Sequence, residues 1–309
     1  MSNGQVVDVR ARRGASWFLL IGAIGAAAGL LPWLTTGPFL PLQNLEETGD
    51  ASRVGPFVLL PFSQYEITTI IVLLVMGGVA AGIAARALRS RPGVTRAIAT
   101  VGGLALVQVV AIIETALVTA SVLQERVEST VYLLLVTAVA ILALVVSLVS
   151  AFVLAAAPRA GAGVALAIGA MAAGMWIGAW LTLPFAYGSP FAAILPLTVH
   201  LGPVLVGAVI AWTGVDTIGR VAAAVVGLLL VWVVPALSTA LASAAGTRVL
   251  ARDLPGMADY GVTVFFSALS LPELTLPSLV VTVVVAAAGL ALRRVLPRAR
   301  RAGAVEPTR

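Results

Sequence analysis

The chain alternates long apolar runs with short polar connections, and about eight of the runs are long enough to cross a membrane. An α-helix rises about 1.5 Å per residue, so about 20 apolar residues cross a hydrocarbon layer about 30 Å thick. In lipid, a helix also pairs its own backbone polar groups. The pattern therefore predicts an all-α, polytopic integral membrane protein. The transmembrane helices are expected at residues 16–36, 66–87, 96–123, 130–157, 163–184, 193–213, 219–245 and 275–296.

The amino-acid composition is typical of an integral membrane protein. Hydrophobic residues make up 60% of the chain and charged residues 10%, and the mean hydropathy is +1.07. Soluble domains carry about 25% charged residues. The chain has no cysteine, which excludes disulfides and thiolate metal sites. It also has no lysine, which excludes Schiff-base chemistry and lysine-based phosphate loops.

The 19 basic residues are all arginines, and 15 of them fall in every second connection. Topology follows this bias, because arginine is costly to translocate. The arginine-rich side is therefore expected to be cytoplasmic, with both termini on that side of the plasma membrane. Anionic lipid headgroups are the expected partners of these arginines, and no nucleic-acid partner is expected. The arginines of this side are Arg10, Arg12, Arg13, Arg86, Arg89, Arg91, Arg96, Arg159, Arg220, Arg293, Arg294, Arg298, Arg300, Arg301 and Arg309, against Arg53, Arg126, Arg248 and Arg252 on the other.

Two halves of the chain share short sequence matches in the same order. Residues 96–117 align without gaps on residues 220–241, and Trp-Leu-Thr at 33–35 recurs at 180–182. Duplicated bundles are common among membrane transport proteins. The matches predict two four-helix repeats. Because four spans restore the starting side, the repeats would be related by an axis along the membrane normal.

This interpretation divides the chain into two units flanked by cytoplasmic tails. The tails are expected at 1–15 and 297–309, the first unit at 16–157 with an outer segment at 37–65, and the second unit at 158–296 with an outer segment at 246–274. Both outer segments carry acidic residues interleaved with apolar ones, so we expect them to lie back on the bundle. The acidic outer face is interpreted as a solvated surface, a vestibule that attracts cations, or a docking surface for a partner.

Glu114 is the one carboxylate expected well inside a span, about 9 residues and therefore about 14 Å from the outer end of the third helix. An ionisable group at that depth is costly and usually faces a bundle interior or water. One hypothesis is a proton relay with His200 of the sixth span. The other is a structural carboxyl that joins helices through Gln108, Thr115 or Thr119. In both cases Glu114 is expected to face the bundle interior.

Three prolines are candidates for helix breaks. Pro196 and Pro203 flank His200 in the sixth span, and Pro235 lies near the middle of the seventh. Proline removes a backbone donor and kinks a helix, and the carbonyls that it frees can line a cavity in a transporter. Such kinks also occur in inert bundles, and the sequence alone does not decide between the two interpretations.

No pattern of catalytic residues is present. The chain has a single histidine and no HExxH, GxSxG or Walker sequence, so no catalytic residue, metal site or cofactor is expected. Carboxylate chemistry of an outer-face transferase or hydrolase is the remaining enzymatic interpretation. We expect a transport-related permease, or a membrane subunit of a transporter, that handles a small hydrophilic or amphipathic substrate between the two units. A separate ATPase or membrane-protein partner would then be involved. The alternative is a non-catalytic membrane scaffold or an assembly subunit of a cell-envelope complex.

Overall fold

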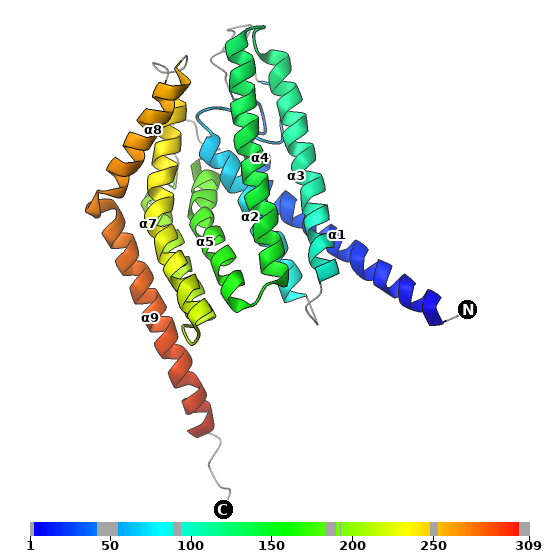
Figure 1. Cartoon of the computed structure of the whole chain (residues 1–309), viewed down its shortest axis with the longest axis vertical. Coiled ribbons are helices and arrows are strands. Elements are labelled where there is room, and N and C mark those ends of the chain that lie inside the picture. Colours follow the sequence, from blue (N-terminus) through cyan, green and yellow to red (C-terminus); the bar gives the residue numbers. More distant parts are fainter. Residues whose placement is uncertain are drawn as a thin grey trace, which may run out of the picture.

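The fold is entirely helical in the part of the chain that the structure describes, which confirms the all-α prediction (Figure 1). The computed structural model describes residues 3–41, 55–88, 94–182, 190–191, 193–247 and 253–302. Within these ranges the helices are α1 (Asn3–Thr36), α2 (Ile67–Ala87), α3 (Val94–Val122), α4 (Val127–Ala156), α5 (Arg159–Thr182), α6 (Leu195–Thr213), α7 (Ile218–Gly246), α8 (Leu254–Leu269) and α9 (Pro272–Ala302).

Eight of these helices are long and apolar enough to cross a membrane, so the prediction of eight transmembrane helices is confirmed. Within α1, the apolar stretch Ser16–Thr36 has the bounds expected from the sequence. The exception is α8, which has only 16 residues. Helices α2, α4 and α6 finish at one end of the bundle, and α3, α5 and α7 begin there. We call this end the arginine-rich end and the other the opposite end.

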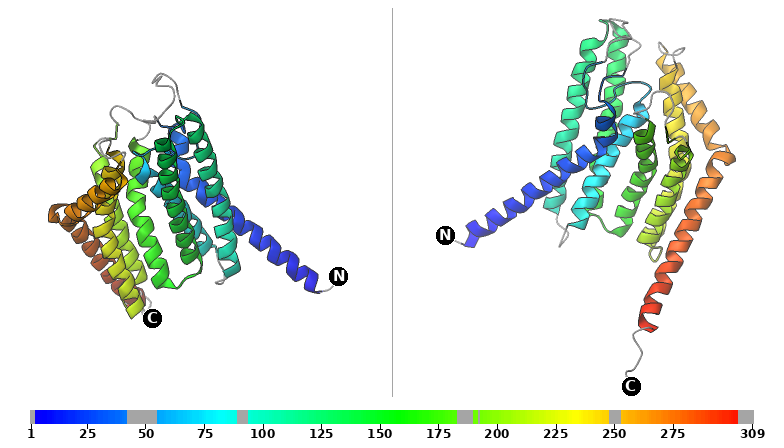
Figure 2. Two further views of the ribbon diagram at one scale, coloured as in Figure 1. Left: turned by 45° about the horizontal axis from the view of Figure 1, so that its top comes forward. Right: turned by 180° about the vertical axis from the view of Figure 1, so that it is seen from behind.

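The first unit is held together by close approaches of small residues. Helix α1 packs on α2 and α3, and α2 packs on α4. Gly29 of α1 lies so close to α2 that an added Cβ would overlap the backbone of Gly77. In lipid, where the hydrophobic effect does not drive helices together, such small-residue contacts allow close van der Waals packing. Figure 2 shows α1 crossing the bundle obliquely, with α9 at the far edge.

The second unit repeats the pattern of helix contacts seen in the first. In the first unit α1 contacts α2 and α3, α2 contacts α3 and α4, and α3 contacts α4. In the second unit α5, α6, α7 and α9 make the same five pairings in the same order, with α8 as an addition. Arg96 and Arg220 are each the third residue of their helix. These contacts do not confirm the internal repeat, and duplication stays a prediction.

Helix α8 runs back along α7 instead of projecting from the bundle (Figure 1). It begins after Asp253, whose side chain accepts a hydrogen bond from the Gly256 N–H, a common way to cap a helix N-terminus. At its other end, the Trp232 Nε1–H donates to the Leu269 carbonyl at 3.2 Å. Since Trp232 lies midway along α7, the described part of residues 246–274 reaches back to the middle of that helix.

The outer segment 37–65 also folds into the bundle where it is described. Phe39 and Phe57 form an isolated antiparallel bridge. Beyond it, Leu60 and Phe62 are fully buried in the core formed by α1 to α4. Residues 42–54, which carry three of the acidic residues on which the outer-face interpretation depends, lie outside the described ranges.

The two units meet along a seam at which α5 is the central helix. Helix α5 contacts α1, α2 and α4 of the first unit, and α2 also contacts α7. Helices α2 and α6 do not contact each other across this seam, and neither do α4 and α7. Both gaps between helices are occupied by cavities that residues of both units line.

Candidate functional site

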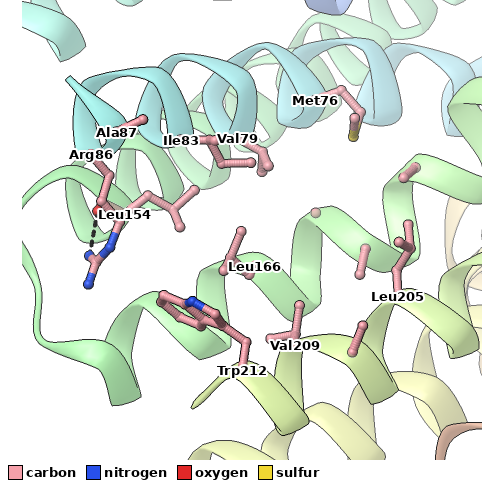
Figure 3. Close-up of a pocket in the computed structure, with 14 residues that line it drawn as sticks. Met76, Val79, Ile83, Arg86, Ala87, Leu154, Leu166, Leu205, Val209 and Trp212 are labelled. Carbon is pink, nitrogen blue, oxygen red and sulfur yellow. Dashed lines mark hydrogen bonds between the residues drawn. The ribbon is translucent and has the colours of Figure 1, made fainter. Parts of the chain in front are cut away.

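The cavity between α2 and α6 is the candidate site, and we call it the seam groove (Figure 3). Its volume is about 630 Å³, within the range of ~300–1,000 Å³ typical of small-molecule sites. Helix α5 forms its floor. The lining is apolar except at the arginine-rich end. The lining residues are Met76, Val79, Ile83, Arg86, Ala87, Leu154, Leu166, Gly169, Ala170, Ala173, Leu205, Ala208, Val209 and Trp212.

Arg86 and Trp212 line the arginine-rich end of the seam groove, which we call its mouth, and Arg159 approaches Trp212 without lining the groove. Figure 3 places Arg86 and Trp212 at one end of the groove and Met76 at the other. The guanidinium carbon of Arg86 lies 5.6 Å from the centre of the Trp212 ring, and that of Arg159 lies 6.0 Å from it. Both distances fall within the range of a cation–π interaction. The mouth therefore gathers two positive charges around one aromatic ring.

Arg86 is held in place by the end of α4. Its Nη1 donates to the carbonyls of Leu154 and Ala157 at 2.8 and 3.0 Å. The last carbonyls of a helix have no donor within the helix and carry partial negative charge, so a guanidinium stabilises them. This contact positions the Arg86 side chain at the groove.

Arg159 has no such support. It is the first residue of α5, is exposed, and makes no ion pair in the described part of the chain. A positive charge at a helix N-terminus opposes the helix dipole, which favours anions there. An anion at the mouth would therefore interact favourably with the Arg159 side chain and with the start of α5.

The surface around the mouth remains positively charged. Arg293 of α9 donates to the carbonyls of Ala211 and Trp212 at the end of α6. Arg220, in the first turn of α7, pairs at 2.8 Å with Asp216 of the exposed connection between α6 and α7. This single pair neutralises Arg220.

Glu114 holds the inserted part of the first outer segment. Its Oε2 accepts hydrogen bonds from the Leu59 N–H and the Thr115 hydroxyl, both at 3.0 Å. The Thr115 Oγ1 in turn accepts from the Leu60 N–H at 3.0 Å. Glu114 thus faces protein hydrogen-bonding partners and does not line the seam groove. These contacts favour the hypothesis of a structural carboxyl, which stays a prediction.

Gln108 lies at the centre of the first unit and is fully buried. Its Nε2 donates to the Leu74 carbonyl at 2.7 Å, and the Ser147 hydroxyl donates to the same oxygen at 2.7 Å. The Gln108 Oε1 has no hydrogen-bond partner among the described residues. Gln108 therefore links α3 to α2 and α4, and its hydrogen bond goes to a backbone carbonyl instead of to Glu114.

His200 is not brought together with Glu114. It is exposed on α6, and α6 does not contact α3, which carries Glu114. A direct proton relay between the two residues is therefore not part of the site. The sequence could not show this, because it does not reveal which helices are neighbours.

The three prolines have different roles. Pro196 lies in the first turn of α6, where proline is well tolerated, whereas Pro203 and Pro235 lie inside helices that continue past them. A smaller cavity of about 290 Å³ lies between α5, α6 and α7 at their level, and Val199 and Pro235 line it. Since proline has no N–H, Pro203 leaves the Val199 carbonyl without its helical donor. This cavity lies within the second unit, not at the seam.

The seam groove could not be identified from the sequence. In the sequence pattern, Arg86 and Arg159 are only topology signals, and Trp212 is only a residue near a span end. A useful signal is present, since all three lie at the same end of their spans. That α2, α5 and α6 bring them together depends on tertiary packing.

Comparisons with known proteins do not assign the site. No protein family, no curated protein and no solved structure matches the chain. Within the described ranges, no group of three His, Cys, Asp or Glu residues could hold a metal ion. The functional argument therefore rests on the geometry and chemistry of the seam groove.

Proposed function

We propose that the protein is a transport-related membrane permease, or the membrane subunit of a transporter, whose substrate is an amphiphile bound in the seam groove. The observation that carries this proposal is an apolar groove, open between two packed units, with the guanidinium group of Arg86 at one end. Cavities at the interface between units are where ligands commonly bind, and where movement of one unit against the other exposes a site to either side.

The dimensions of the groove fit an apolar chain. Arg86 at the mouth and Met76 at the inner end are ten residues apart on α2, which corresponds to about 15 Å along a helix. This is half of the ~30 Å hydrocarbon layer, or one leaflet. An amphiphile that enters from this leaflet would keep its polar group beside Arg86 and its chain against α5.

A second cavity supports movement across the membrane. It has a volume of about 630 Å³ and lies on the same seam at the opposite end, between α4 and the α7–α8 pair. Tyr132, Leu241 and Phe265 are among its lining residues. Val79 of α2 and Gly169 of α5, which pack on each other, both line the seam groove. The seam thus offers one apolar cavity toward each of its two ends.

The proposal places the arginine-rich end in the cytoplasm. The chain has no cysteine, so single cysteines can replace Glu125, exposed between α3 and α4, and Val215, exposed between α6 and α7. In intact cells, Glu125→Cys is expected to react with an impermeant maleimide, and Val215→Cys only after lysis. The reverse pattern would place the arginine-rich end outside.

Transport is tested by following a fluorescent phospholipid in vesicles that contain the purified protein. Dithionite quenches the label in the outer leaflet, so the quenchable fraction reports transfer between leaflets. Wild-type vesicles are expected to transfer the lipid severalfold faster than protein-free vesicles. Leu166→Trp, which fills the groove, is expected to remove most of this gain.

The matched control is Leu106→Trp, on a strongly exposed position of α3 that faces away from the core. It is expected to behave like the wild type. If wild-type vesicles transfer the lipid between leaflets no faster than protein-free vesicles, the result would contradict transfer by this chain alone. Because the sequence has no Walker motif, energy-coupled transport would need a separate ATP-hydrolysing partner.

A second candidate function, a membrane scaffold, is favoured by the large apolar surface of the second unit. Only 22% of the residues in the most apolar windows of α7 and α9 are buried, against 50–56% for α1 and α2. Such faces contact lipid or another membrane protein. A scaffold would bind its partner equally well with Leu166→Trp, because the filled groove leaves α7 and α9 unchanged.

A further inference from the structure

The smaller cavity of the second unit, between α5, α6 and α7, differs from the two seam cavities because hydroxyl groups line it. Thr198 of α6 and Ser238 and Thr239 of α7 are among its lining residues, together with Val199 and two methionines of α5. Its volume of about 290 Å³ is close to the lower limit of ~300 Å³ for small-molecule sites. A ligand of this cavity is therefore small.

The hydroxyl groups lie at the depth of the hydrocarbon layer. Thr239 lies seven residues before Gly246, the last residue of α7, which corresponds to about 10 Å along the helix. At such a depth, a polar group without a hydrogen-bond partner is costly. The polar lining therefore favours a ligand that forms hydrogen bonds over an acyl chain, which forms none.

The two threonine hydroxyls of the cavity have already used their protons. Thr198 donates to the Leu195 carbonyl at 2.8 Å, and Thr239 donates to the Pro235 carbonyl at 3.0 Å. A hydroxyl has one proton and two lone pairs. Each threonine therefore offers the cavity an acceptor and no further donor.

The remaining polar groups of the cavity are also acceptors. The Ser238 hydroxyl donates to the Met175 sulfur at 3.9 Å. Pro203 has no N–H, so it leaves the carbonyl of Val199, a lining residue, without its helical donor. A cavity with this lining is best matched by a ligand that supplies hydrogen-bond donors.

The ligand is also expected to be uncharged. None of the residues that line the cavity, all of which belong to the described part of the chain, carries a charge. Moving a charged ligand from water into such a site costs free energy that no opposite charge in the lining offsets. A molecule with neutral hydroxyl groups provides donors without this cost.

We propose that this cavity binds a small uncharged molecule with hydroxyl donors, of the class of short diols and triols. The ligand hydroxyls donate to the oxygens of Thr198, Ser238 and Thr239, and its carbon atoms contact the methionine side chains. The site goes beyond the proposed function, because it lies within the second unit and does not require the transfer of an amphiphile along the seam.

Binding is tested on the full chain in nanodiscs by saturation-transfer NMR, which detects weak binding of small molecules, with empty nanodiscs as the background. Three probes of similar size are titrated. Propylene glycol carries two donors, dimethoxyethane carries only acceptors, and ethanolamine is charged at neutral pH. Only propylene glycol is expected to give a saturable signal above the background. The absence of such a signal, or equally tight binding of either other probe, would overturn the proposal.

Thr239→Val removes one acceptor of the cavity and keeps the size of the side chain. The loss of one hydrogen bond is expected to weaken the binding of propylene glycol about fivefold. The matched control is Thr182→Val on α5. Its hydroxyl also donates to a carbonyl four residues earlier, that of Gly178, but Thr182 does not line the cavity. The control is expected to bind like the wild type, and equal losses in the two variants would contradict the site.

Gly178→Val tests the location by filling the cavity. Gly178 is a lining residue, and a Cβ added there would lie 3.5 Å from the Thr198 Oγ1, an ordinary contact, so the variant is expected to fold. Its melting temperature without the diol checks this. A folded Gly178→Val protein is expected to lose the saturable signal, and unchanged binding would place the ligand elsewhere and overturn the proposal. If Gly178→Val does not fold, the comparison of Thr239→Val with Thr182→Val decides the question.

Discussion

Gly103→Ala is expected to destabilise the protein strongly, whereas the same change at the neighbouring Gly102 is expected to have almost no effect. A Cβ at Gly103 would overlap the backbone carbonyl of Leu19, because α1 and α3 cross at this point. Backbone atoms of a packed helix cannot move aside without displacing the helix. At Gly102 the added atom would lie 3.5 Å from a Leu19 methyl group, an ordinary contact.

Overpacking of a close interface costs typically 1–3 kcal/mol and more when backbone must shift. The effect is measured as the melting temperature of each variant in detergent. Size-exclusion chromatography after heating gives the fraction of protein that stays folded at each temperature. Gly103→Ala should melt clearly below the wild type, and Gly102→Ala at or slightly above it, because alanine favours a helix over glycine. Equal melting temperatures for the two variants would show that α1 does not cross α3 at Leu19.

Glu114→Leu is expected to be the second most damaging substitution, and Glu114→Gln to be nearly silent. Leucine would leave the half-buried Leu59 N–H without its acceptor. An unsatisfied buried donor costs about 1–3 kcal/mol. Glutamine keeps a side-chain oxygen that accepts from both the Leu59 N–H and the Thr115 hydroxyl. Thermal stability of both variants, with the exposed Glu125→Gln as control, measures the difference.

The same two variants separate a structural carboxyl from a titrating one. If Glu114 only holds the inserted segment, Glu114→Gln should transfer lipid at the wild-type rate. A stable Glu114→Gln protein that has lost transfer would show that protonation of Glu114 is required. A Glu114→Leu protein as stable as the wild type would contradict the role of this carboxylate in holding Leu59.

The transmembrane helices could be predicted from the sequence because the bilayer imposes both their length and their secondary structure. The expected first span, 16–36, matches the apolar stretch of α1, and the expected fourth span, 130–157, differs by a few residues from α4. Here local composition is sufficient, since each span must satisfy its own backbone polar groups in lipid.

The sequence did not predict features that depend on contacts between distant segments. Helix α8 lies in a segment that the sequence analysis treats as an outer connection. Its polar and apolar residues are interleaved, so the sequence does not indicate which surface packs on α7. From the sequence, only side chains are expected as hydrogen-bond partners of Glu114. In the structure, its partner from another segment of the chain is the backbone N–H of Leu59. The acceptor of Gln108 is likewise a carbonyl, that of Leu74 on another helix. Backbone groups carry no sequence signal, so only the fold reveals such partners.

The central claim, that an amphiphile occupies the seam groove, is tested most directly by an electron cryo-microscopy structure in nanodiscs that contain phosphatidylglycerol. The account predicts an elongated density between α2 and α6, with its head beside Arg86 and Trp212 and its chain reaching toward Met76. A seam closed by direct contact of α2 with α6, or a groove that holds no lipid in such a membrane, would contradict it.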